Sequence, residues 1–150
     1  MTKWLTKDQQ ANWRAWIMAS TLLDATLSRE LQESHGLTIT DYEILVRLSE
    51  TKERQVRMSE LADKTLLSRS RLSHQIDRME RAGLVERTVC EDDRRGQLCV
   101  LTDKGWKALV AAAPDHVAGV RAHFVDILSE AEYNALGNAL KKVADHLDSL

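Results

Sequence analysis

The 150-residue sequence predicts a mainly α-helical chain with a small β-hairpin. Three observations support this fold class. The chain has one proline and six glycines, so few positions interrupt a helix or force a turn. Apolar residues recur at steps of three and four through most of the chain, which is the period of an amphipathic helix. Between residues 84 and 102, two β-like runs flank a short charged segment that contains Gly96, a pattern typical of a hairpin.

Two helices are expected in the first third of the chain. Residues 8 to about 33 carry tryptophan, isoleucine and leucine at helical spacing, and His35-Gly36 would end this helix. A second helix is expected over residues 41–49. Its N-terminus is predicted to be a capping box in which Thr40 and Glu43 bond each other's backbone N–H groups.

Two short helices with a three-residue break follow. Residues 56–58 are compatible with a short strand, and Ser59 is expected to cap a helix that runs through Lys64. Ser68 is a good N-cap for the next helix, which should end at Ala82-Gly83. The inward-facing residues of this second helix, at steps of four and three, are expected to be Leu72, Ile76 and Met79.

The last third returns to helix after the hairpin. The expected strands are residues 84–90 and 98–102, with Gly96 at the turn between them. Thr102 would cap a long helix to about Val125, and a capping box at residues 129–132 would begin the final helix. The final helix carries an apolar stripe at alternating steps of three and four, which should pack against another helix.

The charge of the chain is balanced overall but not evenly distributed. Lys and Arg number 21 against 23 Asp and Glu, a net charge of −2, which excludes a histone-like basic protein and an acidic tail. Residues 1–51 hold five basic and seven acidic residues, and residues 100–150 hold the same numbers. Residues 52–99 hold eleven basic and nine acidic residues. The middle third is therefore the relatively positive part.

Several function classes lack support in the sequence. It has no Gly-rich phosphate loop, nucleophile elbow or HExxH motif, so we do not expect an enzyme or a cofactor. Its five histidines and two cysteines form no cluster with metal-ligand spacing, so no metal site is expected. The N-terminus lacks the apolar core of a signal peptide, and no apolar run approaches a membrane span. We expect a cytoplasmic protein without a membrane partner.

The helix that begins at Ser68 is the first candidate for DNA binding. Turning its apolar residues inward turns arginine, serine and histidine outward. An α-helix fits the major groove, where arginine recognises guanine and hydroxyls reach bases or phosphates. The alternative is an ordinary solvated helix face. The candidate DNA-binding residues on this helix are Ser68, Arg69, Ser70, Arg71, Ser73, His74 and Arg78.

The tip of the hairpin is the second candidate. Arg94 and Arg95 could reach a neighbouring minor groove, where narrow A·T tracts attract guanidinium groups. Asp93 would suit this place if it paired with an arginine and held it in one rotamer. The alternative is a charged solvated turn, because acidic residues dilute the tip. The order of helix, turn, helix and charged hairpin favours the DNA-binding interpretation.

Three segments resemble the MarR-type family of winged helix-turn-helix transcriptional regulators. Residues 93–105, DRRGQLCVLTDKG, look like the wing signature of this family. Residues 81–87, RAGLVER, resemble its junction between recognition helix and wing, and residues 58–62, MSELA, resemble its first helix-turn-helix element. The resemblance extends over essentially the whole chain. One departure is Cys99, where the family more often has a branched aliphatic residue.

The resemblance implies a single MarR-type domain over residues 1–150. The winged helix-turn-helix lobe would span about 36–102, and the dimerisation helices about 8–35 and 103–150. Such proteins are usually homodimeric repressors of palindromic operators, and small aromatic or amphipathic effectors commonly release them. By position, the helix from Ser68 would occupy the major groove. Asp93 would orient Arg95 in the minor groove, and Arg94 would meet phosphate.

Other interpretations of the same residues stay open. Cys90 and Cys99 could face each other across the hairpin and act as a redox switch, or they could be small buried hydrophobes. The winged helix could also bind a protein partner instead of DNA. The tryptophans could pack in a dimer core or form an aromatic wall for an effector. These tryptophans are Trp4, Trp13, Trp16 and Trp106.

Overall fold

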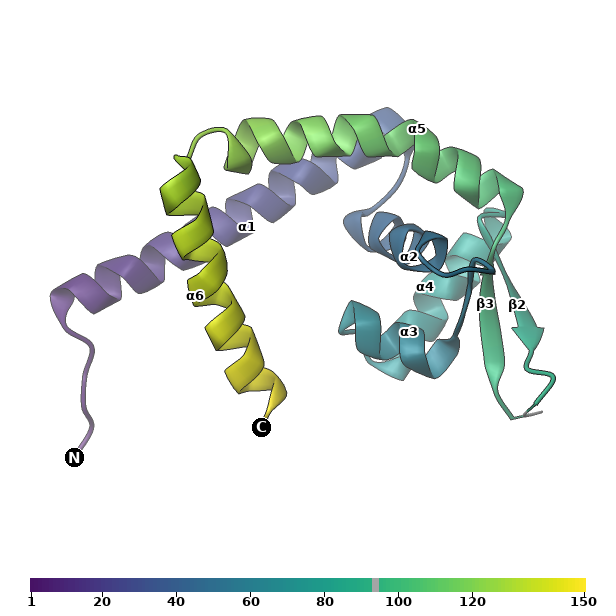
Figure 1. Ribbon diagram of the computed structural model, residues 1–150, viewed down its shortest axis with the longest axis horizontal. Coiled ribbons are helices and arrows are strands. Elements are labelled where there is room, and N and C mark those ends of the chain that lie inside the picture. The colour runs from purple at the N-terminus through teal and green to yellow at the C-terminus, as the bar shows by residue number, and fades with distance from the viewer. Residues whose placement is uncertain (93–94) are drawn as a thin grey trace. The chain divides into compact units, whose positions relative to one another are not determined.

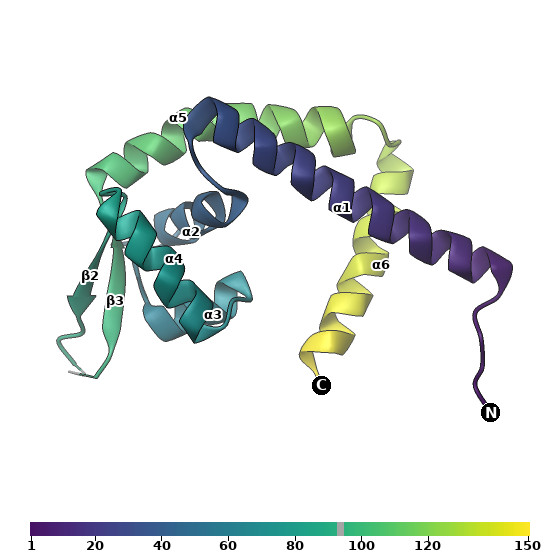
Figure 2. The same cartoon turned by 180° about the vertical axis from the view of Figure 1, so that it is seen from behind.

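The computed structural model describes residues 1–92 and 95–150, and it is mainly helical with a small three-stranded sheet, as predicted (Figure 1). Along the chain, the short helices and the sheet lie between the long helices α1 and α5 (Figures 1 and 2). The elements are α1 (Lys7–His35), α2 (Ile39–Ser49), β1 (Gln55–Arg57), α3 (Met58–Thr65), α4 (Arg69–Arg81), β2 (Val85–Val89), β3 (Gln97–Leu101), α5 (Asp103–Val120), the π-helix η1 (Arg121–Val125) and α6 (Glu130–Asp148).

The chain divides into two compact units. Residues 26–116 form one unit, which we call the lobe, and residues 1–25 with 117–150 form the other, which we call the helical arm. Both α1 and α5 contribute to each unit. Every buried hydrophobic side chain in the described part of the chain belongs to the lobe, so the core that stabilises this protomer lies there.

The sheet of the lobe has strand order β1-β3-β2, and both pairs are antiparallel. Val56 pairs with Cys99, and Val85 pairs with Leu101. These four side chains are buried, whereas residues between them along each strand are more exposed. The expected hairpin and the short first strand are confirmed to within one residue at each end. The predicted turn at its tip includes residues 93–94, which lie outside the described part of the chain.

The N-terminus of α2 corrects one prediction. The capping box joins Thr38 and Asp41, not Thr40 and Glu43. The Thr38 hydroxyl accepts from the Asp41 N–H at 3.0 Å, and the Asp41 carboxylate accepts from the Thr38 N–H at 3.0 Å. Both pairs have the spacing of a capping box, but Ile39 is already helical, so Thr40 lies too far into the helix to serve as its cap.

Helix α3 corrects a second prediction, whereas α4 follows the sequence closely. Helix α3 begins at Met58 and has no side-chain cap, so Ser59 lies within it instead of capping it. The Ser68 hydroxyl caps α4 by accepting from the backbone N–H of Arg71 at 3.2 Å. Helix α4 ends as predicted, because Gly83 adopts a φ of 79° and Leu84 N–H bonds back to the Met79 carbonyl.

The caps of the last two helices agree with the sequence. The Thr102 hydroxyl accepts from the Gly105 N–H at 3.0 Å at the start of α5. Ser129 and Glu132 form the predicted capping box of α6, with hydrogen bonds of 2.8 and 3.1 Å. Within residues 1–92 and 95–150, no helix combines the length and apolar character that a membrane crossing requires.

Candidate nucleic-acid interface

Helix α4 separates an apolar face from a polar one. Leu72, Ile76 and Met79 are each at most 1% exposed and pack into the core of the lobe, as their spacing predicts. The candidate DNA-binding side chains of this helix lie on the other side, and only Ser73 is partly buried. The exposed ones are Ser68, Arg69, Ser70, Arg71, His74 and Arg78.

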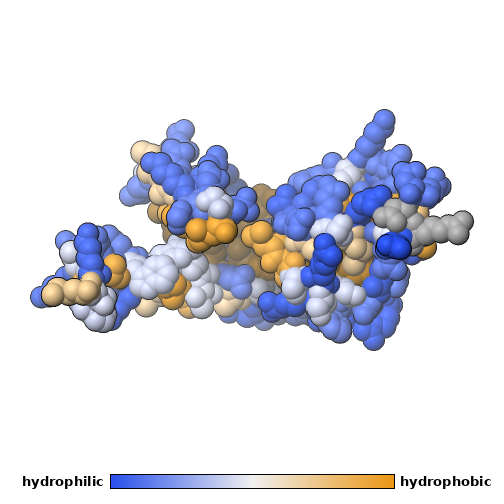
Figure 3. Space-filling model, turned by 90° about the horizontal axis from the view of Figure 1, so that it is seen from below, coloured by the Kyte–Doolittle hydropathy of each residue, from blue (hydrophilic) through white to orange (hydrophobic). Residues whose placement is uncertain are grey.

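A hollow of about 440 Å³ lies where the start of α3, the start of α4 and residues 95–97 of the wing, the β2–β3 hairpin, meet. Two of the predicted site residues from α4, Arg69 and Ser73, line it together with Arg95 from the wing. Arg57 and Ser59 line it as well, from the start of α3. Three arginines around one hollow create a positive potential that attracts phosphate. On the face seen in Figure 3, hydrophilic side chains predominate, with apolar patches between them.

Sequence reasoning missed the contribution of Arg57 and Ser59. The signal available was weak, because Arg57 ends a three-residue strand and Ser59 resembles a helix cap. Only the pairing of β1 with β3 brings these residues beside the wing. Of the predicted wing residues, Arg95 is exposed and lines the hollow, whereas Asp93 and Arg94 lie outside the described residues.

A charged cluster ties the wing to α4. Arg87 on β2 has a side chain only 21% exposed, and its guanidinium contacts Asp77 and lies 3.6 Å from a Glu80 oxygen. The other Glu80 oxygen accepts from the Arg87 backbone N–H at 2.9 Å. Because both acids belong to α4, this cluster fixes the base of the wing against the helix. The wing and α4, which both line the hollow, are therefore held together by this cluster.

Comparison with known proteins agrees with this geometry. The model of the MarR family matches residues 35–96. The transcriptional regulator PecS of Dickeya dadantii is 30% identical over 132 residues, which cover 85% of this chain and 76% of PecS. The crystal structure of AbsC, a MarR family regulator from Streptomyces coelicolor, superimposes with a TM-score of 0.96 at 49% identity, covering 99% of this chain and 100% of AbsC.

The chain belongs to the MarR family. A second structure from Streptomyces coelicolor, the MarR family regulator Sco3205, was solved in complex with DNA. It matches with a TM-score of 0.95 and 41% identity, covering 98% of this chain and 92% of Sco3205. The winged helix-turn-helix fold predicted from the sequence is thus confirmed. As a MarR family transcriptional regulator, the protein acts by binding DNA and not by catalysing a reaction.

In this MarR family protein, the two cysteines do not face each other. Cys90 lies opposite Gly96, because its N–H bonds to the Gly96 carbonyl. Cys99, three residues after Gly96, pairs with Arg87 instead. Three residues span about 10 Å along a strand, and a disulfide needs Cα atoms within about 7 Å. Both thiols are free and buried, and burial raises the pKa of Cys99 to about 12. Of the two alternatives, the strand register excludes a direct disulfide across the hairpin, and the burial of both thiols agrees with small buried hydrophobes.

Aromatic contacts connect helices within the lobe. The Arg54 guanidinium lies 4.1 Å from the centre of the Trp106 ring, so one face of this tryptophan is already covered within the protomer. The rings of Tyr42 and His116 lie 4.4 Å apart and join α2 to α5. Burial lowers the pKa of His116, and its buried Nδ1 has no hydrogen-bond partner in the described structure.

Proposed function

We propose that this MarR family regulator is a homodimeric repressor that binds a palindromic operator. The observation that carries the proposal is the exposed basic face of α4, whose N-terminal end opens into a hollow lined by Arg57, Arg69 and Arg95. A helix in the major groove needs such a face, and phosphate contacts beside it fix the register on the duplex. The DNA complex of Sco3205, which is 41% identical, supports this choice of ligand.

The proposed roles follow from position on the lobe. Ser70, Arg71 and His74 face outward within the first two turns of α4, the part of a recognition helix that reads base edges. Ser68 and Arg69 lie at the start of α4 and would contact a phosphate beside the hollow that Arg69 lines. Arg95 would enter the minor groove from the wing, and the family resemblance adds Asp93 to orient it and Arg94 to contact phosphate.

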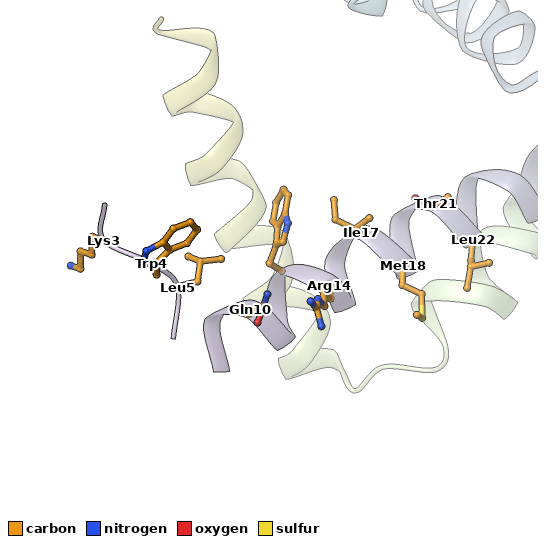
Figure 4. A pocket seen from close by; sticks show the side chains of 10 residues that line it. Lys3, Trp4, Leu5, Gln10, Arg14, Ile17, Met18, Thr21 and Leu22 are labelled. Atoms are coloured by element: carbon orange, nitrogen blue, oxygen red, sulfur yellow. The ribbon is translucent and has the colours of Figure 1, made fainter. Parts of the chain in front are cut away.

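The proposal of a homodimer rests on the apolar surface of the helical arm. Trp4, Leu5 and Trp13 help to line a hollow of about 1150 Å³ that follows the start of α1, with Ile17 and Met18 further along the helix (Figure 4). None of these side chains is buried within the protomer, and Trp4 is 84% exposed. Monomeric proteins rarely expose a continuous apolar patch of this kind. A second copy would cover it and place two α4 helices for a two-fold symmetric site.

Release by a small aromatic or amphipathic effector completes the proposal. The Tyr42 and His116 rings contact each other, and the buried Nδ1 of His116 has no hydrogen-bond partner in the described structure, so a planar effector that displaced one ring could supply that hydrogen bond. Adding hydroxybenzoic acids to the protein–DNA complex tests this part. Release by one of them, and retention of the complex with cyclohexanecarboxylic acid, is the expected result.

The central experiment selects DNA from a genomic fragment library with the purified full-length protein. We expect enrichment of inverted repeats near promoters, and a promoter reporter that the protein switches off. Arg95→Ala should bind the selected duplex at least about 30-fold more weakly, because a lost guanidinium contact costs about 1–3 kcal/mol and a two-fold dimer loses it twice. No enrichment over an untreated library, or unchanged affinity of Arg95→Ala, would contradict the DNA-binding proposal or the role of the wing, respectively.

The dimer has a test of its own. Trp13→Glu places a carboxylate in the apolar surface of the arm, and burial of an unpaired charge costs about 3–5 kcal/mol. We expect the dimer dissociation constant to rise at least about 100-fold, measured by sedimentation velocity. Gln32→Glu adds the same charge at an exposed position of α1 in the lobe and should leave the dimer intact. If both variants sediment like the unmodified protein, the arm is not the dimer interface.

A further inference from the structure

Among the residues that the structure describes, Gln75 is the one polar residue that is buried, at 6% exposure. It lies on the inward side of α4, between Leu72 and Met79, where the helical period calls for an apolar residue. A buried amide without hydrogen bonds is costly, so its partners decide whether this position is tolerated.

Both ends of the Gln75 amide have a charged partner. Its nitrogen Nε2 donates to Oδ1 of Asp41, and its oxygen Oε1 accepts from the guanidinium of Arg78. A guanidinium only donates and a carboxylate only accepts, so the amide can satisfy both in just one orientation. Two hydrogen bonds of Gln75 therefore link a carboxylate on α2 to an arginine on the exposed side of α4.

The carboxylate of Asp41, which begins this series of hydrogen bonds, is itself held in place. The second oxygen of Asp41 accepts from the Thr38 N–H at 3.0 Å and belongs to the capping box of α2. Arg78 is exposed, but its guanidinium is anchored through Gln75 to a helix terminus across the core. A long side chain held in one rotamer before binding loses less conformational entropy when DNA arrives.

We propose that Gln75 is a positioning residue for DNA recognition, which holds the Arg78 guanidinium between α2 and the DNA-facing side of α4. This inference rests on the proposed function, because it requires that Arg78 contacts DNA. Gln75 does not touch DNA in this scheme and acts only through Arg78. The bond between Gln75 and Asp41 makes the placement of Arg78 depend on the N-terminus of α2.

A double-mutant cycle tests this dependence with the full-length protein. Gln75→Met keeps the volume and removes both hydrogen bonds, and Arg78→Met removes the guanidinium. We expect Gln75→Met to weaken binding to the selected duplex at least about fivefold, because ordering a freed side chain lowers affinity and the dimer has one such side chain in each protomer. In the Arg78→Met background the same change should have no effect on affinity. Fluorescence anisotropy measures affinity, and a thermal melt of each variant reports folding separately.

A charge exchange provides the rescue. Gln75→Glu alone places two carboxylates together and should weaken DNA binding more than Gln75→Met does. Adding Asp41→Asn restores the series of hydrogen bonds. The new amide oxygen can accept from Thr38 N–H, and its nitrogen can donate to the new carboxylate at position 75. The double variant Asp41→Asn, Gln75→Glu should recover affinity to within about twofold of the unmodified protein.

The outcomes separate this inference from the proposed function. If Gln75→Met weakens binding equally with and without Arg78, or if the charge exchange gives no recovery, the positioning role is overturned. If Arg78→Met binds like the unmodified protein, Arg78 is not a DNA contact and the inference also falls, while DNA binding by α4 stands. Failure of the proposed function is different, because the unmodified protein would then select no DNA.

Discussion

Replacement of Arg71 by alanine is expected to weaken binding to the selected operator about 100-fold. Arg71 is exposed in the first turn of α4, beside the serine that caps the helix. An arginine that reads a guanine by two hydrogen bonds contributes about 1–3 kcal/mol, and a two-fold dimer loses this contact twice. The variant should fold normally, because its Cβ stays in place and its backbone N–H still bonds Ser68.

The measurement compares the selected duplex with a random-sequence duplex at several salt concentrations. Loss of a base contact should reduce affinity for the selected duplex more than for the random one. Loss of a phosphate contact would reduce both alike and lower the salt dependence by about one counterion per site. Arg29→Ala removes the same charge from an exposed position of α1 and should change neither affinity. An equal loss of affinity for both duplexes would show that Arg71 contacts phosphate and does not read a base.

Replacement of Gly105 by alanine is expected to destabilise the lobe by about 3 kcal/mol or more. A Cβ at this position would lie 2.1 Å from the carbonyl oxygen of Leu84 and 2.7 Å from Cδ1 of Leu101. The first neighbour is backbone at the start of β2, so no side-chain rotation relieves the contact. The same junction is held by the Thr102 hydroxyl, which donates to the Gly83 carbonyl at 2.6 Å. Helix α5 would have to move away from the sheet.

Urea unfolding followed by circular dichroism measures the loss. Gly137→Ala is the matched control, because a Cβ there has no neighbour within 4 Å and the position lies inside α6. Alanine is favoured over glycine in a helix interior by about 1 kcal/mol, so this control should be neutral or slightly stabilising. Equal unfolding midpoints for the unmodified protein and Gly105→Ala would show that α5 can shift from Leu84 at little cost.

Local signals predicted the elements of the fold correctly. The period of apolar residues and the Ser68, Thr102 and Ser129 caps placed the helices to within about three residues at most ends, because such signals involve neighbours in the chain. Where two caps competed within a few residues, the sequence was ambiguous. Thr38 and Thr40 both have an acid three residues later, and only the start of the helix decides between them.

The sequence by itself determined that this chain is a winged helix-turn-helix protein with arginines on the outward face of α4. The tertiary structure alone decided how that face is held. Gln75 meets Asp41 from 34 residues away, Arg87 meets Asp77 across the space between wing and helix, and Cys90 and Cys99 are separated by the strand register. Periodicity tells which side of a helix is buried. It does not tell which atoms meet there, because that depends on how distant segments pack.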